Sequence, residues 1–354
     1  KKQILATHDV SDGGLIVTLL EMAFCSNKGL DISLNESDKD LLVPRLFAEE
    51  VGVVIEVKSE DLKDVKEYLA KKDLYFSEVA KKNEKKEINI TNFNDEIFSD
   101  KIENLFELWS EMSNSIKTIR DNPITTSEQI ATYKKEDIFL NPQINFDIPK
   151  VSSRIFSSRP KVALLREQGI NGHYDMAAAL MASGFEIRDV HMSELGTKVK
   201  NFDDCSGLVV PGGFSYGDVL GAGSGMSNTI MYKAKLKKIF KNFFENEDKF
   251  VLGVCNGCQF LSGLKDIIPG ASNWPKFEKN LSNQYECRLV QIKIAESRSI
   301  FFKDMQNSVI PIMVSHGEGR VGVNVNENVI GNYVDSSHNI AEMYPLNPNG
   351  SKLS

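Results

Sequence analysis

The chain has 354 residues, which is enough for two domains with separate hydrophobic cores. Its formal net charge of −7 argues against nucleic acid or an anionic membrane as a partner, and no apolar run approaches the length of a membrane span. Five cysteines, an odd number, argue against a disulfide framework, so we expect a protein of the reducing cytoplasm.

Residues 1–100 show the pattern of an incomplete α/β layer domain. A charged run at 81–87 indicates a solvated hairpin. The expected elements are strands at 4–7, 51–57, 74–79 and 88–90, a helix at 15–24, and a helix at 62–69 with Ser59 as its N-cap. Half of such a domain is missing from this pattern, so we expect the first half to lie outside this sequence.

The turn at residues 8–14 has two interpretations. Ser11 or Asp12 is a suitable cap for the helix that follows, with the glycines making the turn. Alternatively, Asp9 offers a hard oxygen ligand to Mg²⁺, while Ser11 and the glycine backbone approach a phosphate. The residue chemistry by itself favours the capping interpretation.

Residues 101–159 are expected to connect two domains. Apolar residues at helical spacing predict a helix from about Glu96 to Arg120. After Asp121 the chain is polar with scattered apolar residues as far as Pro160. We therefore expect a helical and extended linker over this region.

Residues 160–354 alternate between strands and helices. Strands are expected at 162–165, 185–190, 208–210 and 250–254, and helices at 177–181 and 230–244. Successive apolar strands with helical crossovers predict a doubly wound, mostly parallel sheet, whose reactive groups gather where the strands end.

One of these strand ends carries a candidate nucleophile. The spacing Gly253-x-Cys255-x-Gly257 is that of a nucleophile elbow, with cysteine in place of serine. Small neighbours leave the sulfur accessible in a strained turn, and the following helix N-terminus favours the thiolate. The alternative is a structural cysteine buried at the end of a core strand.

The loop at 211–218 follows the neighbouring strand at 208–210. Acyl transfer through a thiolate forms an oxyanion, which needs backbone N–H donors at close range. Gly212 and Gly213 can turn an N–H inward, and the N–H of Asn256 can supply the second donor. A glycine-rich surface turn is the alternative. The glycines at 217–225 lack the Lys-Ser/Thr ending of a P-loop.

Three motifs resemble those of a known family. Gly-Val-Cys-Asn-Gly-Cys-Gln at 253–259, Pro-Gly-Gly-Phe-Ser-Tyr-Gly-Asp at 211–218 and Ser-His-Gly-Glu-Gly-Arg at 315–320 are similar to the class I glutamine amidotransferases, whose fold is flavodoxin-like. Together with His-Asp-x-Ser-Asp-Gly-Gly-Leu at 8–15 and Phe-Ala-Glu-Glu at 47–50, they resemble the large single-chain phosphoribosylformylglycinamidine synthase family of purine biosynthesis.

This resemblance implies a reaction at two sites. Cys255 would attack the side-chain amide of glutamine, giving a glutamyl thioester and ammonia. ATP would activate formylglycinamide ribonucleotide, and ammonia would displace the phosphate. The resemblance also implies that Asp9 binds Mg²⁺ and that Ser11 lies at the nucleotide, which reverses the preference for capping. The remaining synthetase domains of a longer parent chain would be partners.

The resemblance also implies a glutamine pocket. Phe214 and Tyr216 would shape it, and His316 and Glu318 would lie near it. Cys258, one helical turn past Cys255, is expected to pack against the core. His338 lies in the polar turn Asp335-Ser336-Ser337-His338 and is expected to be solvated.

The sequence departs from the family in one respect. The base and the third member of the family's catalytic triad lie in a Pro-His-Pro-Glu stretch after Asn-Pro-Asn-Gly-Ser, and this sequence contains no such stretch. We therefore expect a glutaminase domain truncated before that histidine and glutamate, with poor turnover of its own. His316-x-Glu318 repeats the spacing of the missing pair without being its counterpart. A non-catalytic docking module, or another cysteine hydrolase of the same fold, is the alternative function.

Overall fold

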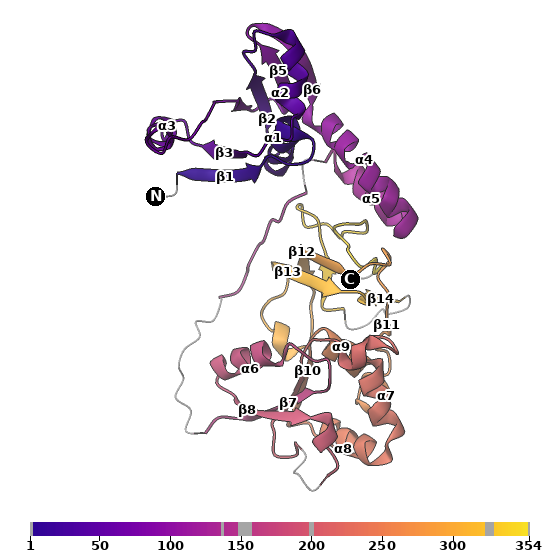
Figure 1. Ribbon diagram of the computed structural model, residues 1–354. Coiled ribbons are helices and arrows are strands. Elements are labelled where there is room, and N and C mark those ends of the chain that lie inside the picture. The colour runs from indigo at the N-terminus through magenta and orange to yellow at the C-terminus, as the bar shows by residue number, and fades with distance from the viewer. Residues whose placement is uncertain (1–2, 136–137, 148–157, 198–201, 323–328, 353–354) are drawn as a thin grey trace. The chain divides into compact units, whose positions relative to one another are not determined.

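A computed structural model describes residues 3–135, 138–147, 158–197, 202–322 and 329–352. Contacts within the chain divide it into two compact units, Lys1–Ile116 and Lys117–Ser354 (Figure 1). Each unit has its own sheets and its own buried cluster of apolar side chains. Within the described part of the chain, no helix is both long and apolar enough to cross a membrane.

The first unit contains two sheets. Its elements are β1 (Ile4–Asp9), α1 (Gly14–Ser26), β2 (Gly29–Ser33), α2 (Leu42–Phe47), β3 (Val53–Val57), α3 (Leu62–Lys71), β4 (Ala80–Asn83), β5 (Glu87–Asn92), β6 (Asp95–Lys101) and most of α4 (Ile102–Arg120). β1 pairs with β3, and the second sheet has the order β4-β2-β5-β6. One face of α1, carrying Ile16 and Leu19, packs into a cluster with Ile32 and Ile88 of the larger sheet.

Four local expectations for this unit are wrong. Residues 74–79 form no strand, and β4 and β5 form no hairpin, because β2 lies between them, antiparallel to β4 and parallel to β5. The N-cap of α3 is Asp61 rather than Ser59. The helix expected from Glu96 begins only at Ile102, since the preceding residues form β6 and pair with β5. Pairing with the adjacent strand β5 thus overrides the local helical pattern.

The segment expected to be a polar linker contains a helix, α5 (Pro123–Thr132). The side chain of Asn122 accepts a hydrogen bond from the N–H of Ile124 at 2.9 Å, and Pro123 occupies the first turn. Both are ordinary signals of a helix start, so the sequence contained the evidence for this helix. Residues 148–157 of the expected linker lie outside the described residues.

The second unit contains the expected parallel sheet. Its strands are β7 (Lys161–Arg166), β8 (Glu186–His191), β9 (Gly207–Val210) and β10 (Phe250–Gly253), in the order β10-β9-β7-β8. Every neighbouring pair is parallel, which confirms the predicted α/β fold. The connecting helices are α6 (His173–Ala182), α7 (Ser224–Tyr232), α8 (Ala234–Phe244) and α9 (Asn256–Ser262). The single helix expected at 230–244 is wrong, because Lys233 is extended and separates α7 from α8.

A second, antiparallel sheet follows the parallel one in the chain and was not predicted. Its strands are β12 (Glu286–Ile294), β13 (Val309–His316) and β15 (Gly331–Tyr333), in the order β13-β12-β15. A short pair, β11 (Phe277–Glu278) with β14 (Arg320–Val321), is formed by segments on either side of β12 and β13 in sequence. Single-turn 3₁₀ helices complete the described elements at Lys39–Leu41, Met192–Glu194, Ser215–Asp218, Lys265–Ile267 and Ile300–Phe302.

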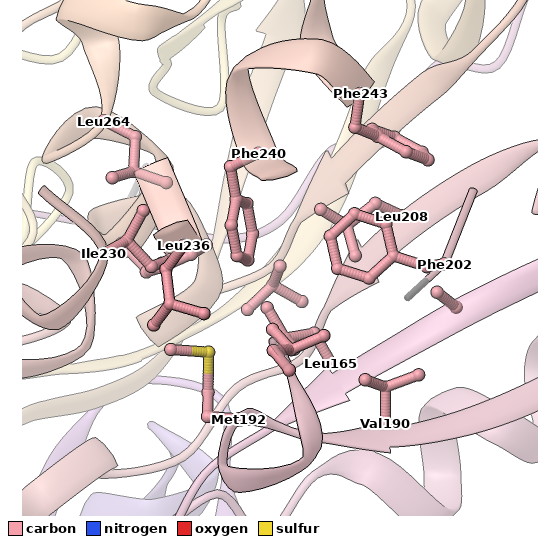
Figure 2. Packing of buried hydrophobic residues seen from close by; sticks show 14 of the residues in the cluster. Leu165, Val190, Met192, Phe202, Leu208, Ile230, Leu236, Phe240, Phe243 and Leu264 are labelled. Carbon is pink, nitrogen blue, oxygen red and sulfur yellow. The ribbon is translucent and has the colours of Figure 1, made fainter. Parts of the chain in front are cut away.

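The core of the second unit lies between the parallel sheet and α8 (Figure 2). Leu165 and Leu208 point from the strands toward Phe240 of α8. The ring of Phe202 makes edge-on contacts with Phe240 and Phe243, at centroid distances of 5.2 and 5.1 Å. Such pairs add a small geometric preference to the apolar area that they bury. This core holds β9 and β10, the two strands that carry the candidate site.

Truncating the centre of this core is expected to be costly. Phe240→Ala should lower the free energy of unfolding of the second unit by about 4 kcal/mol, because the Phe240 side chain is fully buried and leaves a cavity. Urea denaturation followed by tryptophan fluorescence measures the change. Tyr232→Ala removes a ring that is 86% exposed and is the matched control. Equal losses in the two variants would contradict the expectation.

Candidate active site

Cys255 lies in the sharp turn between β10 and α9. It is the N-cap of α9 and has φ 54° and ψ −115°, a strained conformation for a residue with a side chain. The two flanking glycines permit this turn. A Cβ on Gly257 would lie 1.9 Å from the carbonyl oxygen of Val210, and a Cβ on Gly253 would lie 2.5 Å from that of Gly257. The turn therefore has the geometry of the predicted nucleophile elbow, and Cys255 is exposed.

The two predicted oxyanion donors meet at this sulfur. The backbone N–H groups of Gly213 and Asn256 both lie close enough to the thiol of Cys255 to lower its pKa. Gly213 has φ +149°, and a Cβ there would lie 2.6 Å from the Cα of Ile170. A Cβ on Gly212 would lie 3.1 Å from the Cβ of Cys255. Two amides from different loops thus converge on one point beside the sulfur, as an oxyanion hole requires.

The electrostatic balance at Cys255 differs from the prediction. Desolvation by the surrounding protein raises the pKa of the Cys255 thiol, and this effect outweighs the two backbone amides that lower it. The carboxylate of Asp218 raises the pKa further. The amide at the helix N-terminus favours the thiolate as expected, but burial of the thiol has the larger effect, so the net shift of the pKa is upward. Any nucleophilic attack by this sulfur at neutral pH would therefore need a base that removes the thiol proton.

The raised pKa has a measurable consequence. Alkylation of Cys255 by iodoacetamide should accelerate about tenfold per pH unit between about pH 6 and pH 8.5, because the thiolate fraction grows tenfold per unit below the pKa. Peptide mass spectrometry after timed labelling gives the rate at this residue. In urea the pH profile of the labelling rate should move to lower pH, because the Cys255 thiol is no longer buried. A plateau already reached near neutral pH in the folded chain would contradict this.

A buried amide connects the elbow to the loop at 211–218. The Oγ of Ser215 donates to the side-chain oxygen of Asn256 at 2.7 Å, and the Asn256 Nδ2 donates to Asp218 at 2.9 Å. Burial and the nearby carboxylate of Glu318 raise the pKa of Asp218. The roles of Ser215 and Asp218 were not predicted from the sequence. Their only signal was their place in the same loop as Gly213.

Phe214 and Tyr216 lie in this loop, on the exposed side. The ring of Phe214 lies 6.4 Å from that of Tyr285, and the hydroxyl of Tyr216 donates to Glu167 at 2.7 Å. The backbone of the loop is braced by its neighbour, since the N–H groups of Phe214 and Tyr216 donate to the carbonyls of Gly169 and Gln168. The loop is thus held by backbone hydrogen bonds, while its aromatic side chains remain accessible.

The 315–320 segment forms a further side of the site. The thiol of Cys255 donates to the carbonyl oxygen of Ser315 at 3.8 Å. The carboxylate of Glu318 accepts a hydrogen bond from the N–H of Ala222 at 2.9 Å. The ring of His316 contacts Asn280 instead of the sulfur, and burial lowers the His316 pKa. Among the described residues, no histidine is hydrogen-bonded to the Cys255 thiol.

Two further residues differ from their expected surroundings. Cys258 is exposed on α9, so the expectation that it packs against the core is wrong, although the protein around it still raises the pKa of its thiol to about 11. His338, expected to be solvated in a polar turn, makes a contact of 2.7 Å between its Nε2 and the carbonyl oxygen of Asn141. Since a carbonyl only accepts, Nε2 of His338 carries the proton.

The turn at 8–14 in the first unit does not use a side-chain cap. The N-cap of α1 is Gly13, with φ 83°, and neither Ser11 nor Asp12 caps the helix. The N–H of Gly13 donates to Glu49 at 3.0 Å. The carboxylate of Asp9 is 76% exposed and lies 3.3 Å from His8. The capping interpretation is therefore wrong, and Ser11 is exposed as well.

The parallel sheet, the strained turn at Cys255 and the two nearby amides agree with the architecture of the glutamine amidotransferase class. The chain belongs to the family of CobB/CobQ-like glutamine amidotransferase domains, whose model matches residues 159–354. Residues 1–91 match a second model, the C-terminal domain of AIR synthase related proteins. The resemblance to glutamine amidotransferases is confirmed.

One curated relative aligns with nearly the whole chain, and solved structures align with about half of it. The chain is 40% identical, over an alignment of 375 residues, to phosphoribosylformylglycinamidine synthase of Saccharomyces cerevisiae. The alignment covers 98% of this chain and 28% of that relative, so the chain spans under a third of its length. Among solved structures, PurLQS of Thermotoga maritima is 26% identical, with a TM-score of 0.42 over 55% of this chain and 78% of that one. A glutamine amidotransferase of Thermotoga maritima is 14% identical, with a TM-score of 0.30 over 46% and 62%.

Proposed function

We propose that this chain is the glutaminase-bearing part of a phosphoribosylformylglycinamidine synthase in purine biosynthesis. The observation that carries the proposal is the convergence of the Gly213 and Asn256 amides on Cys255. The order of the two matched domains supports it, as does the 40% identity to the yeast synthase. The five cysteines, all unpaired, agree with a cytoplasmic protein.

The first step is attack of the Cys255 sulfur on the side-chain amide carbon of glutamine. A base takes the thiol proton, which the raised pKa of the thiol makes necessary. The carbonyl oxygen becomes an oxyanion and accepts hydrogen bonds from Gly213 and Asn256. The carbon–nitrogen bond then breaks, and protonated nitrogen leaves as ammonia. Water hydrolyses the remaining thioester to glutamate and restores the thiol.

The glutamine substrate would lie between the two loops that border the thiol. Phe214 and Tyr216 supply apolar walls on one side, and the 315–320 segment supplies polar groups on the other. His316 and Glu318 belong to that second side. His316 is neutral at pH 7 because burial lowers its pKa, so it offers a hydrogen-bonding nitrogen without a charge.

The first unit would contribute to the ATP-using site. ATP supplies the phosphoryl group that makes the amide oxygen of formylglycinamide ribonucleotide a leaving group, which ammonia displaces. Magnesium bound with a nucleotide takes one or two carboxylates beside phosphate oxygens, and the exposed carboxylate of Asp9 fits that requirement. The described residues contain no group of three or more metal-binding side chains. The exposed side chain of Ser11 would face phosphate, and the remaining synthetase domains would complete the site.

A glutamine-like electrophile tests the glutaminase proposal directly. Diazo-oxo-norleucine should label the 354-residue chain at Cys255, and added glutamine should protect it. Cys258→Ser is the matched control and should label normally, whereas Cys255→Ser should not label. Labelling at Cys258, or no labelling, would favour a docking module. Labelling of Cys255 by iodoacetamide without protection by glutamine would favour another cysteine hydrolase.

A further inference from the structure

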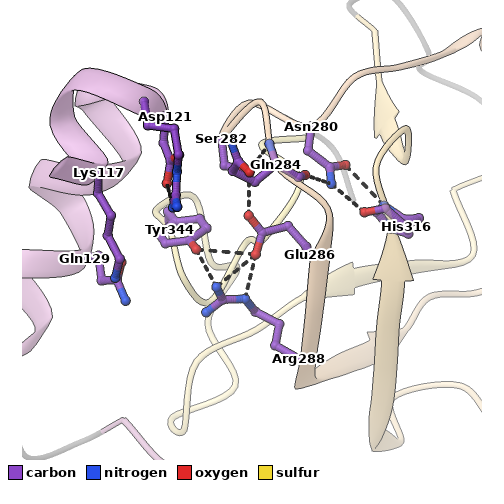
Figure 3. Close-up of polar contacts among 11 residues, drawn as sticks. Lys117, Asp121, Gln129, Asn280, Ser282, Gln284, Glu286, Arg288, His316 and Tyr344 are labelled. Carbon is purple, nitrogen blue, oxygen red and sulfur yellow. Dashed lines mark hydrogen bonds and ion pairs between the residues drawn. The ribbon is translucent and has the colours of Figure 1, made fainter. Parts of the chain in front are cut away.

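The side chain of Asn280 is 1% exposed and makes four hydrogen bonds (Figure 3). Its Nδ2 donates to the carbonyls of His316 at 2.7 Å and Gln284 at 3.0 Å. Its Oδ1 accepts from the N–H of Gly319 at 3.1 Å and contacts Nδ1 of His316 at 3.1 Å. The backbone N–H of Asn280 donates to the carbonyl of Gly317 at 2.9 Å. One buried residue thus holds three residues of the 316–319 turn.

These contacts determine which ring nitrogen of His316 carries the proton. Backbone carbonyls only accept, so the atom facing His316 O and Gln284 O must be the amide nitrogen of Asn280. The N–H of Gly319 only donates, so the other atom must be the amide oxygen. That oxygen faces Nδ1 of His316, and Nδ1 must therefore be the donor. The neutral ring then has Nε2 as its hydrogen-bond acceptor.

The turn that Asn280 holds touches the nucleophile's surroundings at three points. Ser315, immediately before it, accepts from the Cys255 thiol at 3.8 Å. The backbone carbonyl of Glu318 accepts from the side chain of Gln259, which lies on α9. The carboxylate of Glu318 accepts from the N–H of Ala222. A displacement of this turn would therefore move the groups that border the thiol, whereas the elbow keeps its own backbone support.

A second buried network fixes the strand beneath Asn280. Glu286, which is opposite His316 in the β12–β13 register, is 3% exposed and accepts from Ser282 and from Arg288. Arg288 also donates to the hydroxyl of Tyr344 and lies 4.6 Å from the centre of that ring. Figure 3 shows this network beside Asn280. The start of β12 is thus a rigid support for the turn.

We propose that Asn280 is a positioning residue of the glutaminase centre, which holds the 315–319 segment against the thiol and keeps His316 in the Nδ1–H tautomer. The inference rests on the proposed function, because it names a support for the same glutamine site. The hydrogen-bonded partners of the Asn280 side chain include neither the Cys255 sulfur nor the two oxyanion donors. It acts through His316 and through the backbone of the turn.

The test compares two electrophiles on the 354-residue chain. Asn280→Asp keeps the size of the side chain and removes both N–H donors. For diazo-oxo-norleucine, its kinact/KI at Cys255 should fall about tenfold or more, mainly through a higher KI, because the glutamine-facing turn is displaced. The iodoacetamide rate at the same thiol should stay within about threefold, since the elbow is unchanged. Asn92→Asp is the matched control: Asn92 is another buried amide that bridges backbone groups of one segment, in the other unit, and should change neither rate.

Asn280→Ser is the second variant, since Asn280→Asp buries a charge. It removes most of the same bonds without a charge and should show the same selective loss, with folding of both variants checked by near-ultraviolet circular dichroism. Equal losses for both electrophiles, or a change below about twofold in folded variants, would overturn the inference. If the unmodified chain is labelled at Cys255 by iodoacetamide and not by diazo-oxo-norleucine, the proposed function fails and the inference with it. If diazo-oxo-norleucine labels the unmodified chain normally and the Asn280 variants are labelled at the same rate, the inference is overturned while the proposed function stands.

Discussion

Replacing Cys255 by serine in the synthetase that we propose is expected to reduce its glutamine-dependent ligation about 10⁴-fold or more. The serine hydroxyl ionises far less readily than the thiol, and the strained turn still presents it to the same two amides. The loss of glutamine-dependent activity therefore measures the contribution of the thiol itself, because the rest of the site is unchanged. Formation of the amidine product, measured with glutamine as the nitrogen source, gives the rate.

Ammonia is the internal comparison for this variant, because it enters the reaction after the step that Cys255 performs. Product formation from added ammonium chloride should persist in Cys255→Ser at a rate that shows the synthetase domains to be folded. Cys258→Ser, one helical turn away and also exposed, should keep both activities. A glutamine-supported rate within about tenfold of the unmodified enzyme would rule out Cys255 as the nucleophile.

Replacing Gly257 by alanine should have the second largest effect. The new Cβ would lie 1.9 Å from the carbonyl oxygen of Val210 and 2.6 Å from its carbonyl carbon, and both are backbone atoms of β9. Because that strand is paired on both sides, neither atom can move away without disturbing the sheet. We expect a loss of about 3 kcal/mol in the free energy of unfolding. Labelling of Cys255 by diazo-oxo-norleucine should fall about 100-fold.

Chemical denaturation and timed labelling measure the two effects of Gly257→Ala separately. Gly52→Ala is the control, since the nearest atom to a Cβ there would be a side-chain methyl of Val10 at 3.4 Å, an ordinary contact distance. It should change the free energy of unfolding by less than about 1 kcal/mol and leave labelling unchanged. Normal labelling of a folded Gly257→Ala variant would show that the elbow tolerates a side chain and that its glycine is not required.

The site that emerges has three sides around one sulfur. The elbow presents the thiol, the 211–218 loop supplies an amide and aromatic walls, and the 315–320 segment supplies a carbonyl and two polar side chains. The pKa of Cys255 shows that these parts alone do not generate a thiolate at neutral pH. Formation of the thiolate at neutral pH would therefore need a base, and His316, which is bonded to Asn280, is poorly placed to supply it.

Local patterns predicted much of this arrangement. The strand ending at Gly253, the turn at Cys255 and the helix after it follow from short-range rules: glycines permit a turn that other residues cannot make, and apolar runs form buried strands. The donors Gly213 and Asn256 were predicted for a similar reason, since parallel strands that end at one sheet edge bring their following loops together.

Errors arose where pairing between strands decides the structure of a segment. Glu96 lies in a stretch with helical spacing, yet it pairs with β5 as part of β6, because a neighbouring strand satisfies its backbone hydrogen bonds. β4 and β5 are consecutive in sequence and still do not pair, since β2 enters between them. No short window of sequence contains the strand that intervenes.

The sequence by itself determined the strained turn at Cys255, because that turn depends on residues within a few positions of one another, and it predicted the parallel sheet that brings the Gly213 loop beside the turn. Tertiary structure alone decided the ionisation of Cys255, since its pKa reflects how much protein surrounds the thiol from all sides. It also decided that Asn280, unremarked in the sequence, would be buried against the 316–319 turn. Burial is a property of the whole fold, and it sets both the cost of a charge and the value of a hydrogen bond.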